Sequence, residues 1–229
     1  MTNKYKIALS CGRGMGIVKN TTKTWGDIVK KLSTHVELDN KEKAGFFVGG
    51  AFSGEHRVDE DLICRSLLTL DIDEYQGGDI DDLSFDLELS GLGAFVAYST
   101  HRHVNNVPRG RLVLPLSREV SGDEYRVISQ VFCKKTLTLF KFDPCSFKPN
   151  QFMFYPCCPV GGDIWVMVGD GDAVNVDLFL TDKDDVFDVD DESDDDDFTR
   201  DLPLNMSDDE VKGLLFAYEA QGLEYDAWL

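Results

Sequence analysis

Apolar and polar positions alternate in short segments over the first 180 residues of the chain. Period-two alternation and short apolar runs predict strands, which we expect at residues 5–10, 45–52, 67–73, 94–100, 112–116, 151–155, 164–168 and 174–180. Apolar positions at helical spacing predict one helix over residues 24–32 and another after Ser121. The glycine and aspartate residues at positions 169–172 predict a hairpin turn between the last two strands.

The second predicted helix has both a start signal and an apolar face. Ser121 and Glu124 have the spacing of a capping box, in which each side chain bonds the other residue's backbone N–H. Tyr125, Ile128 and Phe132 then follow at helical spacing. The order strand, strand, helix, strand, strand predicts an antiparallel sheet with helices behind it, which is an α+β domain.

Acidic residues gather after position 180. Residues 181–201 contain twelve Asp or Glu against Lys183 and Arg200. Because such a run repels itself and buries no apolar surface, we expect residues 181–202 to be a disordered linker. Two uses stay open for it: a solvated spacer, or a mimic of nucleic acid that competes for a basic groove of the protein itself.

A second module is predicted after this linker. Ser207 and Glu210 have capping-box spacing, and apolar residues at helical spacing follow them. The aromatic residues near the end of the sequence provide more apolar surface than one helix covers. The predicted organisation is therefore a main domain at residues 1–180, the linker, and the start of a helical module at residues 203–229.

Composition narrows the class of protein. A hydrophobic content of 42% and a formal net charge of −19 fit a soluble globular protein. No stretch approaches the ~20 apolar residues that span a bilayer, and the N-terminus lacks the apolar core of a secretory signal. We therefore expect a cytoplasmic location. The six cysteines include no CxxC pair, which favours reduced, mostly buried thiols over a zinc site.

Two carboxylates share one face of the predicted strand 67–73. The strand period of two directs its apolar residues into the core and Asp71 and Asp73 to the other face, ~6–7 Å apart. Magnesium and manganese prefer carboxylate oxygens, and a two-metal site holds its ions ~3.5–4 Å apart. The pair is a candidate nucleotidyl-transfer site. An acidic turn or solvated strand-end charges would give the same pattern, whereas Gln76 stands where an EF-hand calcium loop needs glycine.

A loop rich in basic residues lies between the predicted strands 94–100 and 112–116. Its candidate nucleotide ligands are Ser99, His101, His103, Arg109 and Arg111. Arginine suits bidentate contact with phosphate, and a loop at a sheet edge can present several such groups to one triphosphate. A solvated basic hairpin is the alternative interpretation.

A lone carboxylate, Asp143, lies between Phe142 and Pro144. Its commoner use would be to cap a turn. It could also close a metal site from a strand next to Asp71 and Asp73. The glycine cluster at residues 12–16 has the spacing of neither a P-loop nor a Rossmann fingerprint, so we assign it no role in nucleotide binding.

These three features, in this order, resemble the archaeo-eukaryotic primase superfamily, and most closely the primase-polymerases of phages and mobile elements. Asp71 with Asp73 is similar to the first motif of that family, residues 98–118 to the second, and Asp143 to the third. Flanking segments extend the similarity to most of residues 1–180. One departure is Arg111, which stands where the second motif usually has a histidine before its strand.

The resemblance implies an archaeo-eukaryotic primase fold with an RRM-like antiparallel sheet and an N-terminal α/β unit. It also implies a DNA-directed nucleotidyltransferase that synthesises and extends primers on single-stranded DNA by two-metal catalysis, in phage or mobile-element replication. Asp71, Asp73 and Asp143 would hold Mg²⁺ or Mn²⁺, and the loop residues Ser99, His101, His103, Arg109 and Arg111 would bind the nucleotide.

The implied partners are a single-stranded DNA template, an NTP or dNTP, and a replicative helicase in cis or in trans. For a phage-encoded protein the location would be the host cytoplasm. Two other functions are compatible with the same residues. One is a primer-dependent gap-filling or end-joining polymerase of the same fold, and the other is a non-catalytic replication-origin or DNA-mimic binding protein.

Overall fold

The computed structural model describes residues 3–10 and 18–181. The chain divides into the units Met1–Asp190 and Asp191–Leu229, and all described residues belong to the first. The predicted linker from residue 182 onward, the predicted helical module at residues 203–229 and the glycine cluster at residues 12–16 lie outside the described residues.

The larger sheet is antiparallel and contains the residues of chemical interest. Its strand order is β12 (Val166–Gly169), β7 (Phe95–Ser99), β8 (Gly110–Val120), β6 (Leu62–Tyr75) and β5 (Gly50–Phe52), and β9 (Phe140–Phe142) also pairs with β6. With α2 (Ile80–Leu89) and α3 (Gly122–Thr136), the chain order β6-α2-β7-β8-α3-β9 and the spatial order β9-β6-β8-β7 form a β-α-β-β-α-β unit. The expected α+β class with an RRM-like antiparallel sheet is therefore confirmed.

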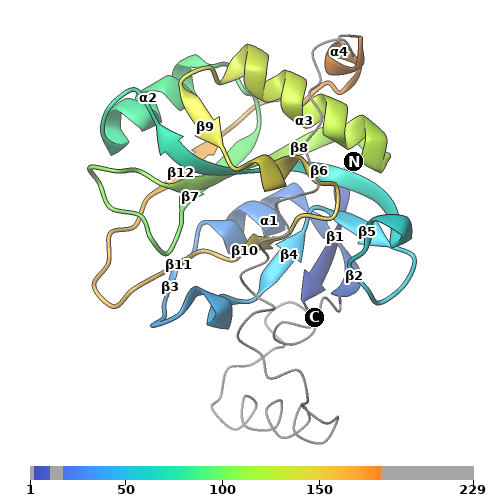
Figure 1. Cartoon of the computed structure of the whole chain (residues 1–229), viewed down its shortest axis with the longest axis horizontal. Helices are drawn as coiled ribbons and strands as arrows, with labels where there is room; N and C mark the ends of the chain where they lie inside the picture. Colours follow the sequence, from blue (N-terminus) through green and yellow to red (C-terminus); the bar gives the residue numbers. More distant parts are fainter. Residues whose placement is uncertain (1–2, 11–17, 182–229) are drawn as a thin grey trace, which may run out of the picture. The chain divides into compact units, whose positions relative to one another are not determined.

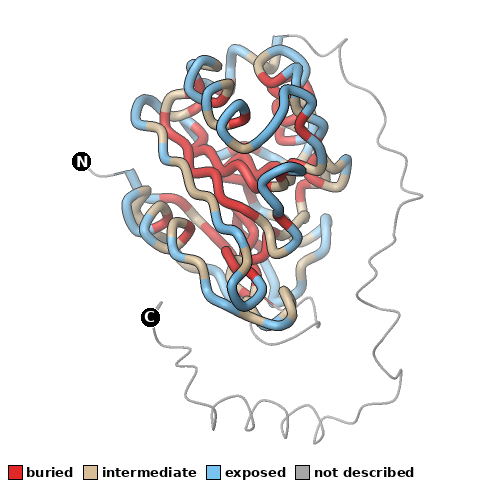
Figure 2. Tube along the Cα trace, turned by 90° about the vertical axis from the view of Figure 1, so that its left-hand side faces the viewer, coloured by how far each residue is buried: buried red, intermediate tan, exposed pale blue. Residues whose placement is uncertain are grey.

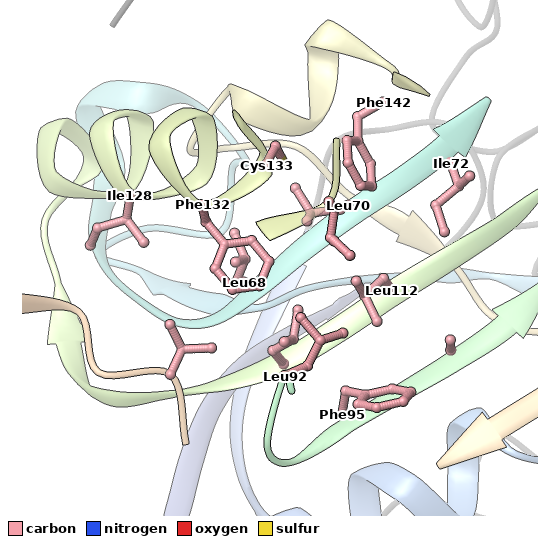
Figure 3. Close-up of a cluster of buried hydrophobic side chains, with 14 of the residues drawn as sticks. Leu68, Leu70, Ile72, Leu92, Phe95, Leu112, Ile128, Phe132, Cys133 and Phe142 are labelled. Atoms are coloured by element: carbon pink, nitrogen blue, oxygen red, sulfur yellow. The ribbon is translucent and has the colours of Figure 1, made fainter. Parts of the chain in front are cut away.

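Helices α2 and α3 cover one face of this sheet (Figure 1). Leu68, Leu70 and Ile72 of β6 are fully buried there, as the strand period predicted. Figure 3 shows Ile128 and Phe132 of α3 directed from the helix toward this sheet face. Buried residues follow the strands through the middle of the molecule, and exposed ones lie on loops and outer helix faces (Figure 2).

The other face of the sheet carries the expected N-terminal α/β unit (Figure 1). Its sheet has the order β10 (Met153–Phe154), β4 (Phe46–Val48), β1 (Lys4–Ser10) and β2 (Val18–Thr24), with α1 (Trp25–Leu32) beside it. A parallel pair, β3 (Val36–Glu37) with β11 (Cys157–Cys158), and the short helices η1 (Lys41–Ala44), η2 (Asp59–Asp61), η3 (Pro144–Phe147) and α4 (Asp177–Leu180) complete the described part.

Two strand predictions were wrong. Residues 45–52 form two strands, because the chain leaves β4 at Gly49 and enters the other sheet as β5. Residues 174–180 contain an isolated bridge at Val174 and the helix α4, whose Phe179 packs on the core. No hairpin joins these residues to β12, which pairs with β7 instead. Helix α2 was not predicted, although Asp79 caps it through a capping box with Asp82.

None of the helices among residues 3–10 and 18–181 has the length and apolar composition needed to cross a membrane.

Candidate functional site

The predicted carboxylates lie where three strands of the larger sheet meet. Asp71 and Asp73 lie near the C-terminal end of strand β6. On one side Asp71 is opposite Arg111 of β8, and on the other side Ile72 is opposite Phe142 of β9. The fold therefore brings the first and second motif strands and the third motif segment together near the C-terminal end of β6.

Asp71 and Arg111 form an ion pair across β6 and β8. The Oδ2 atom of Asp71 accepts from Arg111 Nε at 3.1 Å and lies 3.0 Å from Arg111 Nη2. The side chain of Arg111 is 10% exposed and that of Asp71 is 23% exposed. Arg111 also donates from Nη1 to the carbonyl of Phe154 at 3.5 Å. Much of the bonding capacity of Arg111 is thus used within the protein.

Asp73 is more exposed and faces a different arginine. Its Oδ1 lies 3.8 Å from Arg109 Nη1, and both side chains are about two-fifths to one-half exposed, at 47% and 39%. Burial raises the pKa of the Asp73 carboxyl, and the negative charges of Asp143 and Asp71 raise it further. Arg109 and Lys141 act in the opposite direction. The three carboxylates are thus close enough to repel one another.

Asp143 is tied to the same place through its backbone. Its N–H donates to the carbonyl of Asp71 at 3.0 Å. Its Oδ1 accepts from the N–H of Cys145 at 2.9 Å, so it also caps the short helix η3. Asp143 therefore caps a turn, which is the commoner use of such an aspartate, and it also lies beside β6 as expected.

A network of hydroxyl groups holds η3, the short helix after Asp143, against β6. The Tyr125 hydroxyl on α3 donates toward the carbonyl of Thr69 or of Ser146, each at 3.1 Å, and accepts from Arg65 Nη2 at 3.1 Å. The Ser146 hydroxyl accepts from the N–H of Asp71 at 2.8 Å. Sequence reasoning missed these three residues, because a tyrosine on a helix, a serine and a strand arginine have no distinctive pattern.

The basic loop contains fewer free ligands than predicted. Ser99 is fully buried, and its hydroxyl accepts from the N–H of Trp165 at 3.0 Å and bonds His35 Nε2 at 2.9 Å. His103 is buried, and its Nδ1 accepts from the N–H of Arg109 at 3.3 Å. Burial lowers the pKa of the His103 imidazole. These two residues shape the loop.

His101 contacts the N-terminal unit rather than open solvent. Its Nε2 lies 2.9 Å from the carbonyl of Leu38. This contact places the loop beside η1, which begins at Lys41. Lys41 therefore lies within electrostatic reach of Arg111 and of the exposed Arg102, and sequence reasoning missed both Lys41 and Arg102 as candidates. Lys41 sits in an ordinary charged segment, Lys41-Glu42-Lys43, which gave no signal.

The donor set near the C-terminal end of β6 has the chemistry of a site for a hard divalent cation, because it consists of three carboxylates that repel one another. Within the described residues, however, no three His, Cys, Asp or Glu side chains form a cluster that could hold a metal ion. Arg111 holds Asp71 Oδ2 in the structure. The carboxylates are thus gathered by the fold without being arranged as a closed coordination shell.

A family model described as the VapE N-terminal domain matches residues 2–192 of the chain. Among solved structures, the chain is similar to the AEP domain (PP-N190) of the primase-polymerase of cyanophage S-2L. The sequences are 14% identical, the TM-score is 0.43, and the match covers 79% of this chain and 88% of that one. No curated protein matches.

Proposed function

We propose that this chain, which belongs to the VapE N-terminal domain family, is the nucleotidyltransferase domain of a primase-polymerase of the archaeo-eukaryotic primase superfamily. It would synthesise and extend primers on single-stranded DNA in phage or mobile-element replication. The observation that carries the proposal is the convergence of Asp71, Asp73 and Asp143 near the C-terminal end of β6, beside two guanidinium groups.

In the proposed reaction the primer 3′ oxygen forms a bond to the α-phosphorus of the incoming nucleotide, and the bond to pyrophosphate breaks. Asp71, Asp73 and Asp143 would hold Mg²⁺ or Mn²⁺, which when bound neutralises charge on the phosphates and makes the hydroxyl proton more acidic. Arg109, whose Nη1 lies 3.8 Å from Asp73 Oδ1, would pair with the negative charge that develops on the leaving pyrophosphate. No covalent intermediate with the protein is required.

The test is nucleotide incorporation on a single-stranded template, with and without a primer, using NTPs and dNTPs with magnesium or manganese. Asp73→Asn should abolish incorporation, because it removes one anionic ligand from a partly exposed position without changing the shape of the side chain. Asp81→Asn is the matched control, since Asp81 is an exposed aspartate in the first turn of α2. Wild-type incorporation by Asp73→Asn would refute the assignment.

A primer-dependent gap-filling or end-joining polymerase would use the same residues. The arm without primer separates it from a primase, because only a primase starts a strand from two nucleotides. Extension of a primer with no product in the primer-free arm would identify this narrower activity.

A non-catalytic DNA-binding protein is the second candidate, and a specific observation favours it. Arg111 already neutralises Asp71, and the described residues contain no assembled metal cluster. In this case the domain would bind single-stranded DNA but incorporate no nucleotide with either metal, and Asp73→Asn would leave DNA affinity unchanged.

A further inference from the structure

Two cations approach one aromatic ring next to the candidate site. The Lys41 ammonium on η1 lies 5.5 Å from the centroid of the Phe154 ring, and the Arg111 guanidinium lies 5.9 Å from the same centroid. Phe154 belongs to β10, in the N-terminal unit, whereas Arg111 belongs to the larger sheet. A cation from η1 and a cation from the larger sheet therefore lie on either side of one ring, and Arg111 also binds Asp71.

Arg102 adds a third cation at this place. Its neighbour His101 holds the loop against Leu38 at 2.9 Å, shortly before η1 begins. Burial lowers the pKa of the Lys41 ammonium, and the positive charges of Arg102 and Arg111 lower it further, so Lys41 lies within electrostatic reach of both arginines. Asp71 and Glu42 act in the opposite direction but do not reverse the effect.

Two of these three cations have no ion-pair partner among the described residues. Among residues 3–10 and 18–181, Lys41 and Arg102 form no ion pair, and Asp71 is the carboxylate that Arg111 binds. Lys43, two positions along η1, contrasts with Lys41 because its ammonium lies 2.7 Å from Asp39. In a chain with a formal net charge of −19, two cations without ion-pair partners beside Arg111 indicate a place for an external anion.

We propose that Lys41 and Arg102, with the charge of Arg111 behind them, form the subsite for the polyphosphate of a nucleoside triphosphate, and that Lys41 is a residue that determines its affinity. The inference rests on the proposed function and names a substrate-binding group in that site. Three cations at one locus beside carboxylates suit a compact polyanion, whereas the backbone of single-stranded DNA spreads its charges along a groove.

The experiment compares Lys41→Met with the matched control Lys43→Met in the full chain. Binding of ATP, AMP and inorganic tripolyphosphate is measured by calorimetry, with and without magnesium, and binding of a fluorescent oligo(dT) by anisotropy. Lys41→Met should weaken ATP and tripolyphosphate about tenfold, as expected for loss of a charge-assisted bond, with little change for AMP. Lys43→Met should stay close to the wild type, and Arg102→Met should weaken both polyphosphates.

Four results would overturn the inference. The first is wild-type affinity of Lys41→Met for both polyphosphates, and the second is absence of any polyphosphate binding by the wild-type chain. The third is a loss confined to oligo(dT), which would make Lys41 a contact of the DNA backbone. Equal losses in Lys41→Met and Lys43→Met would likewise exclude a specific role and indicate only a change in net charge.

The outcomes also separate this inference from the proposed function. Polyphosphate binding that depends on Lys41 in a chain that incorporates no nucleotide would support the subsite and reject the polymerase. Nucleotide incorporation that is unaffected by Lys41→Met, with unchanged polyphosphate affinity, would support the polymerase and reject the subsite.

Discussion

The ion pair between Asp71 and Arg111 links the chemistry of the site to the stability of the domain. Each charge is mostly removed from water, with side-chain exposures of 23% and 10%, and each depends on the other for compensation. Removal of one partner from such a pair leaves a charge that is buried and unpaired, which costs more than the pair itself contributes. Asp71 is therefore a structural residue whatever its role in nucleotide transfer.

Asp71→Ala should lower the free energy of unfolding by about 2–3 kcal/mol, because it leaves the Arg111 guanidinium without its carboxylate. The double variant Asp71→Ala/Arg111→Met should be more stable than Asp71→Ala, since it removes both charges. Urea denaturation at neutral pH measures both differences. If the double variant were no more stable than the single one, the charge of Arg111 would not be the cause of the loss.

Asp73→Asn should have the opposite effect on stability. The raised pKa of Asp73 means that the folded state disfavours its charged form, through burial and through the charges of Asp143 and Asp71. A neutral isostere should therefore stabilise the protein at pH 7, by less than about 1 kcal/mol once solvent screening of a half-exposed group is considered.

The gain from Asp73→Asn should shrink as the pH falls through the folded-state pKa toward the unfolded value of 3.8, because the wild-type carboxyl then takes up its proton. Thermal melting of both proteins from pH 7 to pH 4 tests this sign. Destabilisation by Asp73→Asn at pH 7 would show that Arg109 outweighs the neighbouring carboxylates.

On one side of strand β6, between its pairings with β5 and β9, side chains rather than another strand bind the backbone. Strand β5 pairs with its beginning and β9 with its end. Between them, the Tyr125 hydroxyl lies 3.4 Å from the N–H of Thr69, and Ser146 accepts from the N–H of Asp71. Arg65, fully buried, donates to the carbonyl of Leu67 at 3.2 Å and to the carbonyl of Pro149 at 2.9 Å.

Tyr125→Phe should cost about 1–3 kcal/mol, because it removes a hydroxyl with buried partners on β6, η3 and Arg65. It should also reduce any nucleotide incorporation, since the Asp143 segment is held partly through Ser146. Tyr5→Phe is a matched control in the N-terminal unit. Equal stability of the two variants would show that the network does not contribute to folding.

Sequence periodicity identified the elements whose residues all face one core. It placed β1, α1, β6, β7 and α3 correctly, and it assigned Leu70 and Ile72 to the core. It failed where the chain changes sheets. A Cβ on Gly50 would clash with the carbonyl of Cys64, and a Cβ on Gly49 would lie 2.7 Å from that of Leu67. These close approaches depend on β6, which lies outside the segment whose local pattern predicted one strand over residues 45–52.

In the candidate site, too, local sequence pattern predicted some residues, and contacts between distant segments decided the rest. Asp71, Asp73 and Asp143 were predicted from local pattern, and the fold brings them together. The loop residues were predicted from charge alone, and charge does not reveal that Ser99 and His103 are buried. Lys41 could not be predicted, since only the packing of η1 against the loop places it near Arg111.

At the scale of the whole molecule, the described part ends with a helix that belongs to the core. Phe179 of α4 packs edge to face on Phe132 of α3, with centroids 5.4 Å apart. Leu180 also packs against the core. The boundary predicted at residue 180 therefore falls at the end of α4, and a shorter domain would expose apolar surface of α3.

A chain of residues 1–181 should unfold at the same temperature as the full chain, whereas a chain of residues 1–176 should lose about 2 kcal/mol because it lacks Phe179. Comparison of residues 1–181 with the full chain also tests the acidic run after residue 181. If that run mimics nucleic acid, residues 1–181 should bind single-stranded DNA more tightly than the full chain, most clearly at low salt. Equal affinities at two salt concentrations would make it a spacer.

Strand β10 gives the protein a particular order of events during synthesis. Met153 and Phe154 pair with Phe47 and Phe46, so a segment made after α3 completes the edge of the N-terminal sheet. At ~5–20 residues per second, the ribosome releases β10 on the order of ten seconds after β4. Until then β4 has an open edge, which a nascent chain must keep from pairing with a neighbour. The two sheets are therefore completed together during synthesis, and neither can be removed or exchanged as an independent domain.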